Sequence, residues 1–563
     1  METNDYIQIF LFLFLLIALT PLLGSYMAKV LNGDRNLLSP LFGKVEKAIY
    51  KITGVQEAES MNWKKYTVSL LLFNLAGFLL LFLLLMIQKG LPFNPQQIGN
   101  MNWHTALNTS VSFITNTNWQ SYSGETGLSY FSQMAGLTVQ NFLSAATGIA
   151  VLVALARGII GKTIESIGNF WIDVTRSTLY ILLPLSILLA VVLAGQGVVQ
   201  NLNHYTEATT LQGETQIIPQ GPAASQIAIK QLGTNGGGFF GTNSAHPFEN
   251  PTPLSNFLQM LAILLIPAAL TYTYGKMVKS QKQGWAIFAA MFILFAVGLA
   301  VSFYSEFHSS ELWNNMASME GKETRFGVTN SVLWSVVTTS ASNGSVNAMH
   351  DSLTPLSGMI AMINMMLGEI IYGGAGSGLY GIIIFIILTV FIAGLMVGRT
   401  PEYLGKKIEA FEIKMAIIAV LSPSLVILLF SAIACSIPPG LSSLNNTGPH
   451  GLSEILYAFT SAAGNNGSAF AGLNVSTVFY NVMVALGMLI GRFGIIIPVL
   501  AIAGSLARKK SIPVSQGTFK TDNALFVGLL IAIILIVGGL TFFPALSLGP
   551  VVEHILMGKG VMF

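Results

Sequence analysis

Long apolar segments alternate with short polar connections along the whole chain. A run of about 20 apolar residues is long enough to cross the hydrocarbon core of a bilayer as a helix. Ten such segments are present, at residues 7–28, 66–87, 132–156, 177–195, 254–275, 285–304, 357–397, 412–436, 476–505 and 522–543. The pattern predicts an all-α membrane protein with ten transmembrane helices.

The seventh segment, at residues 357–397, is too long for one simple helix. Its centre, at residues 373–378, reads Gly-Gly-Ala-Gly-Ser-Gly. Glycines permit backbone that is not helical, and such backbone is tolerated at membrane depth only inside protein or beside water. We therefore expect a break or a re-entrant turn here, and we take Gly373, Gly374 and Gly376 as gating candidates.

Four polar runs rich in Gly, Asn, Ser and Thr lie between the long apolar segments. They occupy residues 114–120, 233–238, 340–345 and 463–468. Each run follows a stretch that we predict to be a short helix, near residues 104–114, 222–232, 328–340 and 451–462. The separations between markers in successive runs are 119, 108 and 123 residues, the markers being Asn116, Asn235, Asn343 and Asn466. Such a period indicates repeated architecture.

Each repeat is predicted to be a helix, a short helix, a loop and a second helix. All four run in the same direction, so we expect parallel repeats around a pseudo-fourfold axis rather than the inverted repeats of many secondary transporters. The predicted units are 66–156, 157–275, 276–397 with its broken second helix, and 398–505. A flanking helix with a cytoplasmic loop (1–65) precedes them, and a last helix with an external tail (506–563) follows.

The composition supports a membrane protein. Hydrophobic residues make up 53% of the chain and charged residues 9%, and the mean hydropathy is +0.66. Soluble proteins carry about 25% charged residues. The net charge of +3 is small and comes from the loops. We therefore expect membrane lipid around the protein and no nucleic-acid partner.

The lysines and arginines predict the orientation. Most of the 27 lie in connections 29–65, 157–176, 276–284, 398–414 and 506–521. The positive-inside rule makes these connections cytoplasmic, so both termini and all four polar runs are predicted to be extracellular. Arg399 begins one cytoplasmic connection, and we interpret it as an interfacial anchor or a coupling candidate. The external carboxylates are either solvated loop surface or a vestibule that concentrates cations.

The polar runs suit a monovalent cation. A small cation leaves water only where oxygens replace its hydration shell, and backbone carbonyls facing one axis can do this. Glycine accepts the positive φ that turns successive carbonyls inward, a role that we assign to Gly236, Gly237, Gly238, Gly344 and Gly467. The short helices end at this axis, where their dipoles favour positive charge.

The predicted ligands of this selectivity filter come from all four runs. Hydroxyl groups add oxygens, and the asparagines brace the loops from behind. Trp119 and Gln120 replace glycines in the first run, so we expect Trp119 to pack behind the filter, while Gln120 is able to offer an oxygen. The candidates are Thr115, Asn116, Thr117, Asn118, Gln120, Thr234, Asn235, Gly236, Gly237, Ser342, Asn343, Gly344, Asn465, Asn466 and Gly467.

At these residues the chain resembles the potassium-binding, channel-like A subunit of the bacterial Kdp potassium-transporting ATPase. The resemblance covers the whole chain, and its characteristic stretches are residues 115–122, 233–240, 346–351 and 461–470. It implies potassium selection for high-affinity import, with ATP hydrolysed by a separate P-type ATPase subunit (B) and smaller C and F subunits completing the complex. It also implies the bacterial cytoplasmic membrane, and a sideways exit of the ion beneath the third repeat's intramembrane loop.

Two buried charges are candidates for gating or coupling. Glu369 lies just before the glycine-rich break, and a carboxylate at such depth is presumed functional, although a structural acid is an equal alternative. Arg492 is the basic residue well inside a predicted span. It either pairs with an acid or forms an electrostatic barrier below the filter.

The chain lacks the motifs of an energy-converting enzyme. The phosphorylation sequence Asp-Lys-Thr-Gly-Thr does not occur, and Gly161-Lys162-Thr163 lacks the earlier glycine of a P-loop because position 156 is Ala. We expect a non-catalytic, ion-translocating subunit. The alternatives are a Trk/Ktr-type potassium transporter that works as a homodimer with a cytoplasmic nucleotide-binding regulator, and a membrane-embedded enzyme. The seven histidines show no ligand spacing, so potassium is the one metal ion that we predict.

Overall fold

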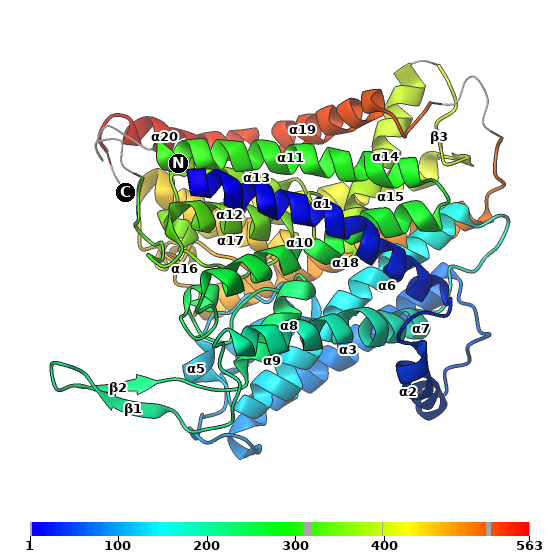
Figure 1. Ribbon diagram of the computed structural model, residues 1–563. Helices are drawn as coiled ribbons and strands as arrows, with labels where there is room; N and C mark the ends of the chain where they lie inside the picture. The colour runs from blue at the N-terminus through cyan, green and yellow to red at the C-terminus, as the bar shows by residue number, and fades with distance from the viewer. Residues whose placement is uncertain (1–2, 309–316, 397, 514–518, 562–563) are drawn as a thin grey trace.

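The structure, a computed structural model, describes residues 3–308, 317–396, 398–513 and 519–561 (Figure 1). Within these residues, ten helices are long and apolar enough to cross a membrane, and they confirm the ten predicted spans. They are α1 (Thr3–Asn32), Trp63–Gly90, Ser132–Ile160, Phe170–Gly195, α10 (Pro253–Met277), α11 (Gln281–Phe307), α14 (Ser377–Met396), α15 (Ala410–Ser436), α18 (Val478–Arg508) and Ala524–Met557.

Four of these helices change their helical geometry along their length. Short 3-10 or π-helical turns interrupt or end them without ending the span. Their parts are α3 (Trp63–Ile87) and η1 (Gln88–Gly90); η2 (Ser132–Thr138) and α6 (Val139–Ile160); α7 (Phe170–Arg176), η3 (Ser177–Leu182) and α8 (Leu183–Gly195); and α19 (Ala524–Leu546), η7 (Ser547–Val551) and α20 (Val552–Met557).

The seventh predicted segment is broken, as its glycines predicted. A helix of 12 residues, α13 (Pro355–Met366), covers its first part, and α14 covers its last part. Residues 367–376 between them form no helix, and we call them the intramembrane loop. Gly368 and Gly376 have φ angles of 87° and 90°, which side chains rarely tolerate. The glycines thus end one helix and allow the chain to turn before the next.

Four short helices precede the polar runs at the predicted places. They are α4 (Trp103–Ile114), α9 (Ala223–Leu232), α12 (Gly327–Ser340) and α17 (Gly448–Gly464). Each stands between two long helices, so the order helix, short helix, loop, helix occurs four times in one direction. The helices α1 and Ala524–Met557 flank the four repeats. The exact division of the chain into units stays a prediction.

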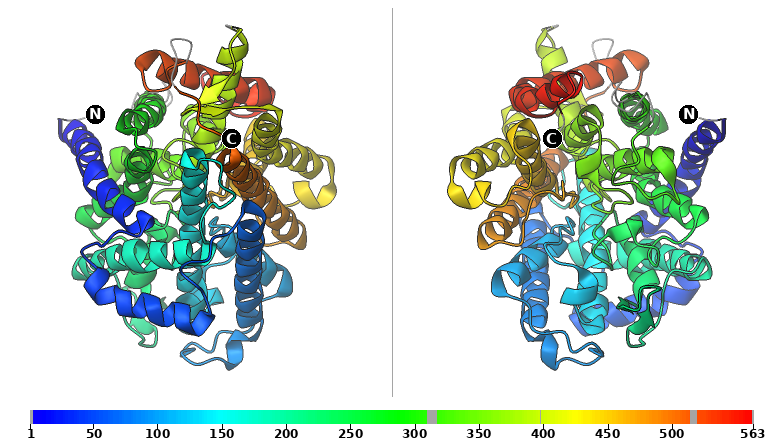
Figure 2. Two further views of the ribbon diagram at one scale, coloured as in Figure 1. Left: turned by 90° about the vertical axis from the view of Figure 1, so that its right-hand side faces the viewer. Right: turned by 90° about the vertical axis from the view of Figure 1, so that its left-hand side faces the viewer.

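The second long helix of each repeat tends to be more deeply buried than the first. In the most apolar part of each helix, 83% of residues are buried in Ser132–Ile160 and 78% in Pro253–Met277, against 28% in Trp63–Gly90 and 33% in Phe170–Gly195. Figure 2, which looks along the helices, shows α1 and α19 at the periphery. The exposed apolar faces of the outer helices are the surfaces that lipid covers.

Side-chain caps fix where several inner helices begin. Thr252 accepts a hydrogen bond from the backbone of Ser255, whose hydroxyl in turn accepts from the backbone of Thr252, and Pro253 starts α10. Thr477 caps α18 in a similar way, by accepting from the backbone N–H of Tyr480. These caps satisfy N–H groups that a helix start leaves without partners. The caps therefore fix the residue at which each helix begins.

The connections separate into two ends of the molecule. Both termini and the hairpin of β1 (Thr206–Thr209) and β2 (Thr215–Ile218) lie at one end, and α2 (Ser39–Thr53) and β3 (Glu402–Tyr403) lie at the other (Figure 1). This is the two-sided arrangement that the lysines and arginines predicted. The remaining short elements are β4 (Lys406–Lys407), which pairs with β3, and α5 (Gly124–Gly127), η4 (Asn243–Ala245), η6 (His350–Ser352) and α16 (Pro438–Leu441).

Candidate ion-binding site

Each short helix ends in a loop whose first residues have left-handed backbone. We call these axial loops 1 (115–120), 2 (233–238), 3 (341–346) and 4 (465–469). Left-handed conformation costs most side chains about 1–2 kcal/mol per residue, so a non-glycine residue in this state near the start of every loop is unusual. These residues and their φ angles are Asn116 (67°), Thr234 (51°), Ser342 (56°) and Asn465 (58°), and loop 1 has a second one at Asn118 (53°).

These left-handed residues give the four loops a common register. In loops 2 to 4 the residue that follows is an asparagine, and these are Asn235, Asn343 and Asn466. In loop 1 the residue that follows is Thr117. Asn116 is itself the left-handed residue, so Thr117 rather than Asn116 is equivalent to Asn235, Asn343 and Asn466. The repeat is real, but its first copy is shifted by one residue.

The loops touch one another closely on one side of the ring. A Cβ atom added to Gly236 would lie 2.0 Å from the Gly344 nitrogen, so loops 2 and 3 are in backbone contact. A Cβ atom on Gly344 would lie 2.6 Å from the Asn466 carbonyl oxygen, which brings loops 3 and 4 together. Real Cβ atoms essentially never approach other atoms this closely, so only glycine fits.

The same kind of contact closes the ring on its other side. A Cβ atom on Gly467 would lie 2.0 Å from the Thr117 carbonyl oxygen, joining loop 4 to loop 1. One on Gly237 would lie 2.9 Å from the Asn118 carbonyl oxygen, joining loop 1 to loop 2. The four loops therefore form one closed arrangement, which we call the axial ring.

Asparagine amides hold the axial ring together. Each bridges to a neighbouring repeat, as predicted for a brace, and the donors and acceptors are buried. The bonds are from Asn116 Nδ2 to the Thr234 carbonyl (2.9 Å), from Asn343 Nδ2 to the Lys230 carbonyl (3.0 Å), from Asn466 Nδ2 to the Thr338 carbonyl (3.0 Å) and from Asn465 Nδ2 to the Thr117 hydroxyl (3.0 Å).

Several buried carbonyls of the axial ring lack a hydrogen-bond donor. The great majority of buried backbone carbonyls are paired, so each exception needs an explanation. Within the described residues, every loop contributes at least one buried carbonyl that accepts no hydrogen bond. They are the carbonyls of Thr117, Asn118, Asn235, Gly344 and Asn466. All four axial loops therefore contribute carbonyl oxygens that no described donor occupies.

Not every glycine has the expected role. Gly236, Gly237 and Gly467 have positive φ angles of 98°, 65° and 102°, as predicted. Gly238 and Gly344 are not among the residues with positive φ, so this part of the prediction is wrong. Gly344 is needed because loop 4 lies against its α-carbon, and the left-handed turns are made instead by polar residues just before the glycines.

Trp119 and Gln120 give loop 1 a different construction. Trp119 is 1% exposed and packs with Ile455, Phe459 and other apolar residues of α17, so it lies behind the ring as predicted. The Gln120 amide donates to the Gly238 carbonyl (3.0 Å) and accepts from the Gly238 N–H (2.9 Å). Its oxygen is therefore engaged with loop 2 rather than offered to the axis.

A buried ion pair supports loop 2, and no local sequence pattern predicts it. Lys230 and Glu249 are 1% and 0% exposed and form a close ion pair. The Lys230 ammonium also donates to the Gly237 carbonyl (3.0 Å), and Glu249 accepts from the Phe239 N–H (3.0 Å). Removal of one partner would leave a buried charge without compensation.

A vestibule of about 1,240 Å³ opens onto the axial ring. Residues from all four loops line it, namely Asn118, Gln120, Gly237, Gly344 and Gly467. Two histidines follow lining residues in the chain. Burial and the nearby Arg325 lower the pKa of His246 to about 4, and burial lowers the pKa of His350 to about 4. Both rings are neutral at neutral pH and place no positive charge beside the ring.

The intramembrane loop lies against the opposite face of the axial ring. The Ala375 N–H donates to the Thr234 hydroxyl (2.7 Å), and a Cβ atom on Gly374 would lie 3.2 Å from Ser342 Cβ. A Cβ atom on Gly376 would lie 2.1 Å from the Gly148 carbonyl oxygen. The loop therefore covers the inner side of the ring, away from the vestibule.

Glu369, within this loop, and Arg492 of α18 are both buried. Glu369 has a left-handed φ of 50°, and its Oε1 has no hydrogen-bond partner among the described residues. Arg492 donates through Nη2 to the Ser144 carbonyl (3.1 Å), while its Nε has no partner in the same part of the chain. Arg492 forms no direct ion pair with an acid among the described residues, but it lies near enough to Glu369 for the two charges to attract each other, so both predicted alternatives stay open.

The remaining gating candidates differ in their surroundings. A Cβ atom on Gly373 would lie 1.5 Å from the Glu369 carbonyl oxygen, so Gly373 makes the tight turn of the intramembrane loop. Arg399 is exposed just beyond the end of α14, where its N–H donates to the Gly394 carbonyl (2.8 Å). Its position is that of an interfacial residue, well removed along the chain from the axial ring.

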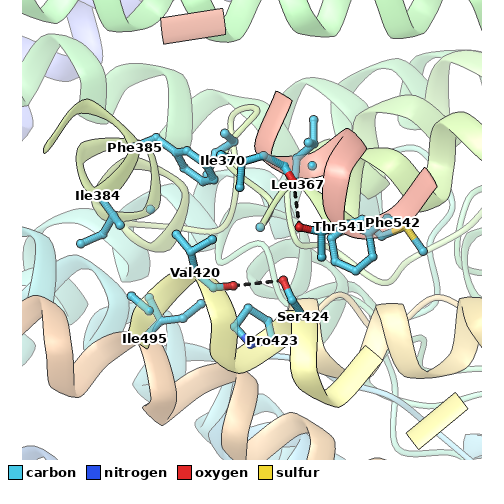
Figure 3. Close-up of a pocket in the computed structure, with 16 residues that line it drawn as sticks. Leu367, Ile370, Ile384, Phe385, Val420, Pro423, Ser424, Ile495, Thr541 and Phe542 are labelled. Carbon is cyan, nitrogen blue, oxygen red and sulfur yellow. Dashed lines mark hydrogen bonds between the residues drawn. The ribbon is translucent and has the colours of Figure 1, made fainter. Parts of the chain in front are cut away.

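An apolar cavity of about 40 Å³ lies on the side of the intramembrane loop that faces α14, α15 and α19 (Figure 3). The polar hydroxyls in its wall are turned to their own helices, because Thr541 donates to the Val537 carbonyl (2.7 Å) and Ser424 to the Val420 carbonyl (3.1 Å). The other labelled residues that face it are Leu367, Ile370, Ile384, Phe385, Pro423, Ile495 and Phe542.

The sequence matches a known family over almost its full length. A family model described as "Potassium-transporting ATPase A subunit" matches residues 10–555. The chain belongs to this family. The family assignment agrees with the resemblance at the four axial loops, and it covers both flanking helices as well as the repeats.

Relatives in this family are similar over the whole chain. A protein from Mesorhizobium japonicum named potassium-transporting ATPase potassium-binding subunit is 57% identical over 567 residues, which are 100% of both chains. The protein of the same name from Pseudomonas syringae pv. tomato is 57% identical over 563 residues, which are 99% of this chain and 100% of the relative.

A solved structure shows the same fold with little sequence identity. The potassium transporter TrkH from Vibrio parahaemolyticus superimposes with a TM-score of 0.52 and 16% identity, covering 88% of this chain and 97% of that one. At this identity the likeness concerns the fold. It shows that the repeats of a helix, a short helix, a loop and a helix also occur in a separate transporter.

Proposed function

We propose that the chain binds extracellular potassium in the axial ring and passes it to a partner P-type ATPase subunit for ATP-driven import. The observation that carries this proposal is the set of five buried, unpaired carbonyls contributed by all four axial loops. A potassium ion can exchange its water shell for such oxygens. The names of the relatives, which are potassium-binding subunits of a potassium-transporting ATPase, support potassium as the ion.

The route after the ring is proposed to turn sideways. The intramembrane loop covers the inner face of the ring, and the positive charge of Arg492 opposes a cation that continues straight on. Glu369 supplies a buried carboxylate beside this turn. The small apolar cavity between the loop, α14, α15 and α19 leaves the loop incompletely packed on this side, and the loop is proposed to yield toward it when an ion passes.

ATP hydrolysis is assigned to a partner because this sequence has no ATPase motif. We propose a complex with a catalytic B subunit and smaller C and F subunits, in the bacterial cytoplasmic membrane. The positive-inside rule puts α2 and β3 in the cytoplasm, so the vestibule and both termini face the outside. Purification tests this: co-purification of a P-type ATPase supports the proposal, whereas a soluble nucleotide-binding ring would favour the Trk/Ktr-type alternative.

Gly236→Ser tests the axial ring as the potassium site. The added side chain meets the Gly344 backbone and pushes loops 2 and 3 apart. We expect the Kd for potassium of the purified complex to rise at least tenfold, which corresponds to about 1.4 kcal/mol, with assembly unchanged. Gly195→Ser is the matched control, since nothing lies within 4 Å of a Cβ there. An unchanged Kd in an assembled Gly236→Ser complex would contradict the proposal.

A further inference from the structure

A cluster of charged side chains lies outside the axial ring, at the end of the molecule that carries the vestibule. His450 and Glu454 stand one turn apart on α17, and Asp351 comes from η6 after axial loop 3. One ligand atom from each of these three residues lies within 4.8 Å of the other two. Glu553 of α20 joins the cluster through His450.

His450 is held in the orientation of a metal-binding histidine. Its Nδ1 lies 2.7 Å from Glu553 Oε1, and its Nε2 lies 3.2 Å from Asp351 Oδ1. Histidines that bind metals typically donate one ring N–H to a carboxylate, which fixes the ring and leaves the other nitrogen for the metal. Glu553 is placed for the first role, and the Asp351 side of the ring faces the remaining ligands.

Glu454 provides an independent observation that points to a cation ligand. Its side chain is fully buried, Oε1 accepts from Asn446 Nδ2 (2.8 Å), and Oε2 has no hydrogen-bond partner among the described residues. A Cβ atom added to Gly472 would lie 2.1 Å from Glu454 Oε1 and 2.6 Å from Asp351 Oδ2. The glycine thus leaves just enough space for two carboxylates to approach each other.

The charges of the cluster do not balance. Three carboxylates surround one imidazole, and no described ion pair brings a Lys or Arg to any of them. Buried charges are normally paired or coordinate a metal. Carboxylate oxygens with one imidazole nitrogen form a ligand set for zinc or a similar divalent transition metal, and a potassium ion would have no use for the imidazole.

We propose that Asp351, His450 Nε2 and Glu454 bind one divalent transition-metal ion, with zinc as the best match, while Glu553 orients His450. A tetrahedral zinc site requires ligand atoms about 3.3 Å apart, so the three side chains close in slightly on binding. A pocket of about 980 Å³ reaches Asp351, His450 and Glu553 and gives the ion an entry and room for water as a fourth ligand.

The proposed metal would clamp three separate parts of the protein. Asp351 follows axial loop 3, His450 and Glu454 belong to the short helix before axial loop 4, and Glu553 belongs to the last transmembrane helix. His450 also stacks on Phe470, with ring centroids 6.0 Å apart, and Phe470 follows axial loop 4. The metal therefore stabilises the outer side of repeats 3 and 4 without contacting the axial ring itself.

Zinc binding to the purified complex tests the proposal. After removal of metals with a chelator, equilibrium dialysis against Zn²⁺ is expected to give one tightly bound ion per chain. Glu454→Gln and His450→Gln are each expected to raise the Kd for Zn²⁺ at least tenfold, and Glu553→Gln about tenfold, as for other groups that orient a ligand. His204→Gln is the matched control, because His204 is exposed in a polar connection.

A second measurement on the unmodified protein covers the case in which these variants fail to assemble. X-ray absorption at the zinc edge is expected to report one imidazole among nitrogen and oxygen ligands. The absence of bound Zn²⁺ in the wild type, a site with no imidazole, or equal binding by the wild type and an assembled Glu454→Gln complex would each overturn the proposal. None of these results depends on where potassium binds.

Discussion

The axial ring and the intramembrane loop touch each other but are built in opposite ways. In the ring, each loop is joined to its neighbours by asparagine amides and by backbone contacts that exclude a Cβ atom. In the intramembrane loop, Glu369 has a carboxylate oxygen without a partner among the described residues, and an apolar cavity lies alongside. Every loop of the ring is joined to both of its neighbours, whereas the intramembrane loop packs against the ring and against Phe288 and Phe295 but borders an apolar cavity on another side.

This difference separates two physical tasks. Selection needs carbonyl oxygens at fixed positions, because an ion is discriminated by how well they replace its water shell. Passage needs a segment whose contacts can be exchanged at low cost, and such segments have few packed partners and many glycines. A hydrogen bond from the Ala375 N–H to the Thr234 hydroxyl connects the two regions and also supports a strained residue of axial loop 2.

Gly344→Ala disturbs the axial ring and is expected to have the largest effect on potassium binding. The new methyl group meets the Asn466 carbonyl and the Gly467 backbone, neither of which can move as a flexible side chain would. Overpacking of this kind costs about 1–3 kcal/mol, so the Kd for potassium is expected to rise by up to about 100-fold. The measurement is potassium binding by the purified complex, with Gly90→Ala, which meets nothing within 4 Å, as control.

Gly376→Ala introduces a comparable steric clash in the intramembrane loop. Its φ of 90° is unfavourable for alanine, and the methyl group would meet the Gly148 carbonyl. We expect the potassium transport rate to fall about tenfold through strain of about 1–3 kcal/mol, while the Kd for potassium changes less than about threefold. Gly539→Ala serves as control. A large change in the Kd for potassium with a normal transport rate would show that selection and passage are not separated between the ring and the loop.

Arg492→Gln removes a charge beside the loop and keeps a donor for the Ser144 carbonyl. With the barrier weakened, ions leak past without ATP, and we expect the ratio of potassium transported to ATP hydrolysed to fall about threefold. Flux into proteoliposomes measures this, and Arg35→Gln, in the exposed connection after α1, is expected to leave the ratio unchanged. Wild-type coupling in Arg492→Gln would reject the barrier.

The sequence predicted what depends on local patterns. Apolar runs determine the ten spans, the glycines at 373–378 determine the break, and the polar runs mark the ends of four short helices. The amphipathic α2 and the hairpin of β1 and β2 went unpredicted, because both lie in connections that were judged only by charge. The choice of Asn116 as a marker also shifted the first loop by one residue relative to the other three, because in loop 1 an asparagine occupies the left-handed position.

Contacts between distant residues could not be predicted in this way. Lys230 and Glu249 carry no mark in the sequence that distinguishes a buried ion pair from two surface charges. Asp351, His450 and Glu553 are brought together only when η6, α17 and α20 pack at the outer end, so ligand spacing along the chain does not reveal them. The role of Gly344 likewise arises from a different repeat lying against it.

Gln120→Ala probes the outer edge of the ring, where the smallest effect is expected. The change removes two hydrogen bonds to Gly238, each worth about 0.5–1.5 kcal/mol, but water in the vestibule can replace them because Gln120 is only partly buried. The Kd for potassium should therefore rise about threefold, against no change for Gln212→Ala in the exposed hairpin. A loss as large as that of Gly344→Ala would mean that the Gln120 oxygen serves the ion directly, and that loop 1 selects with a side chain where the other loops use backbone.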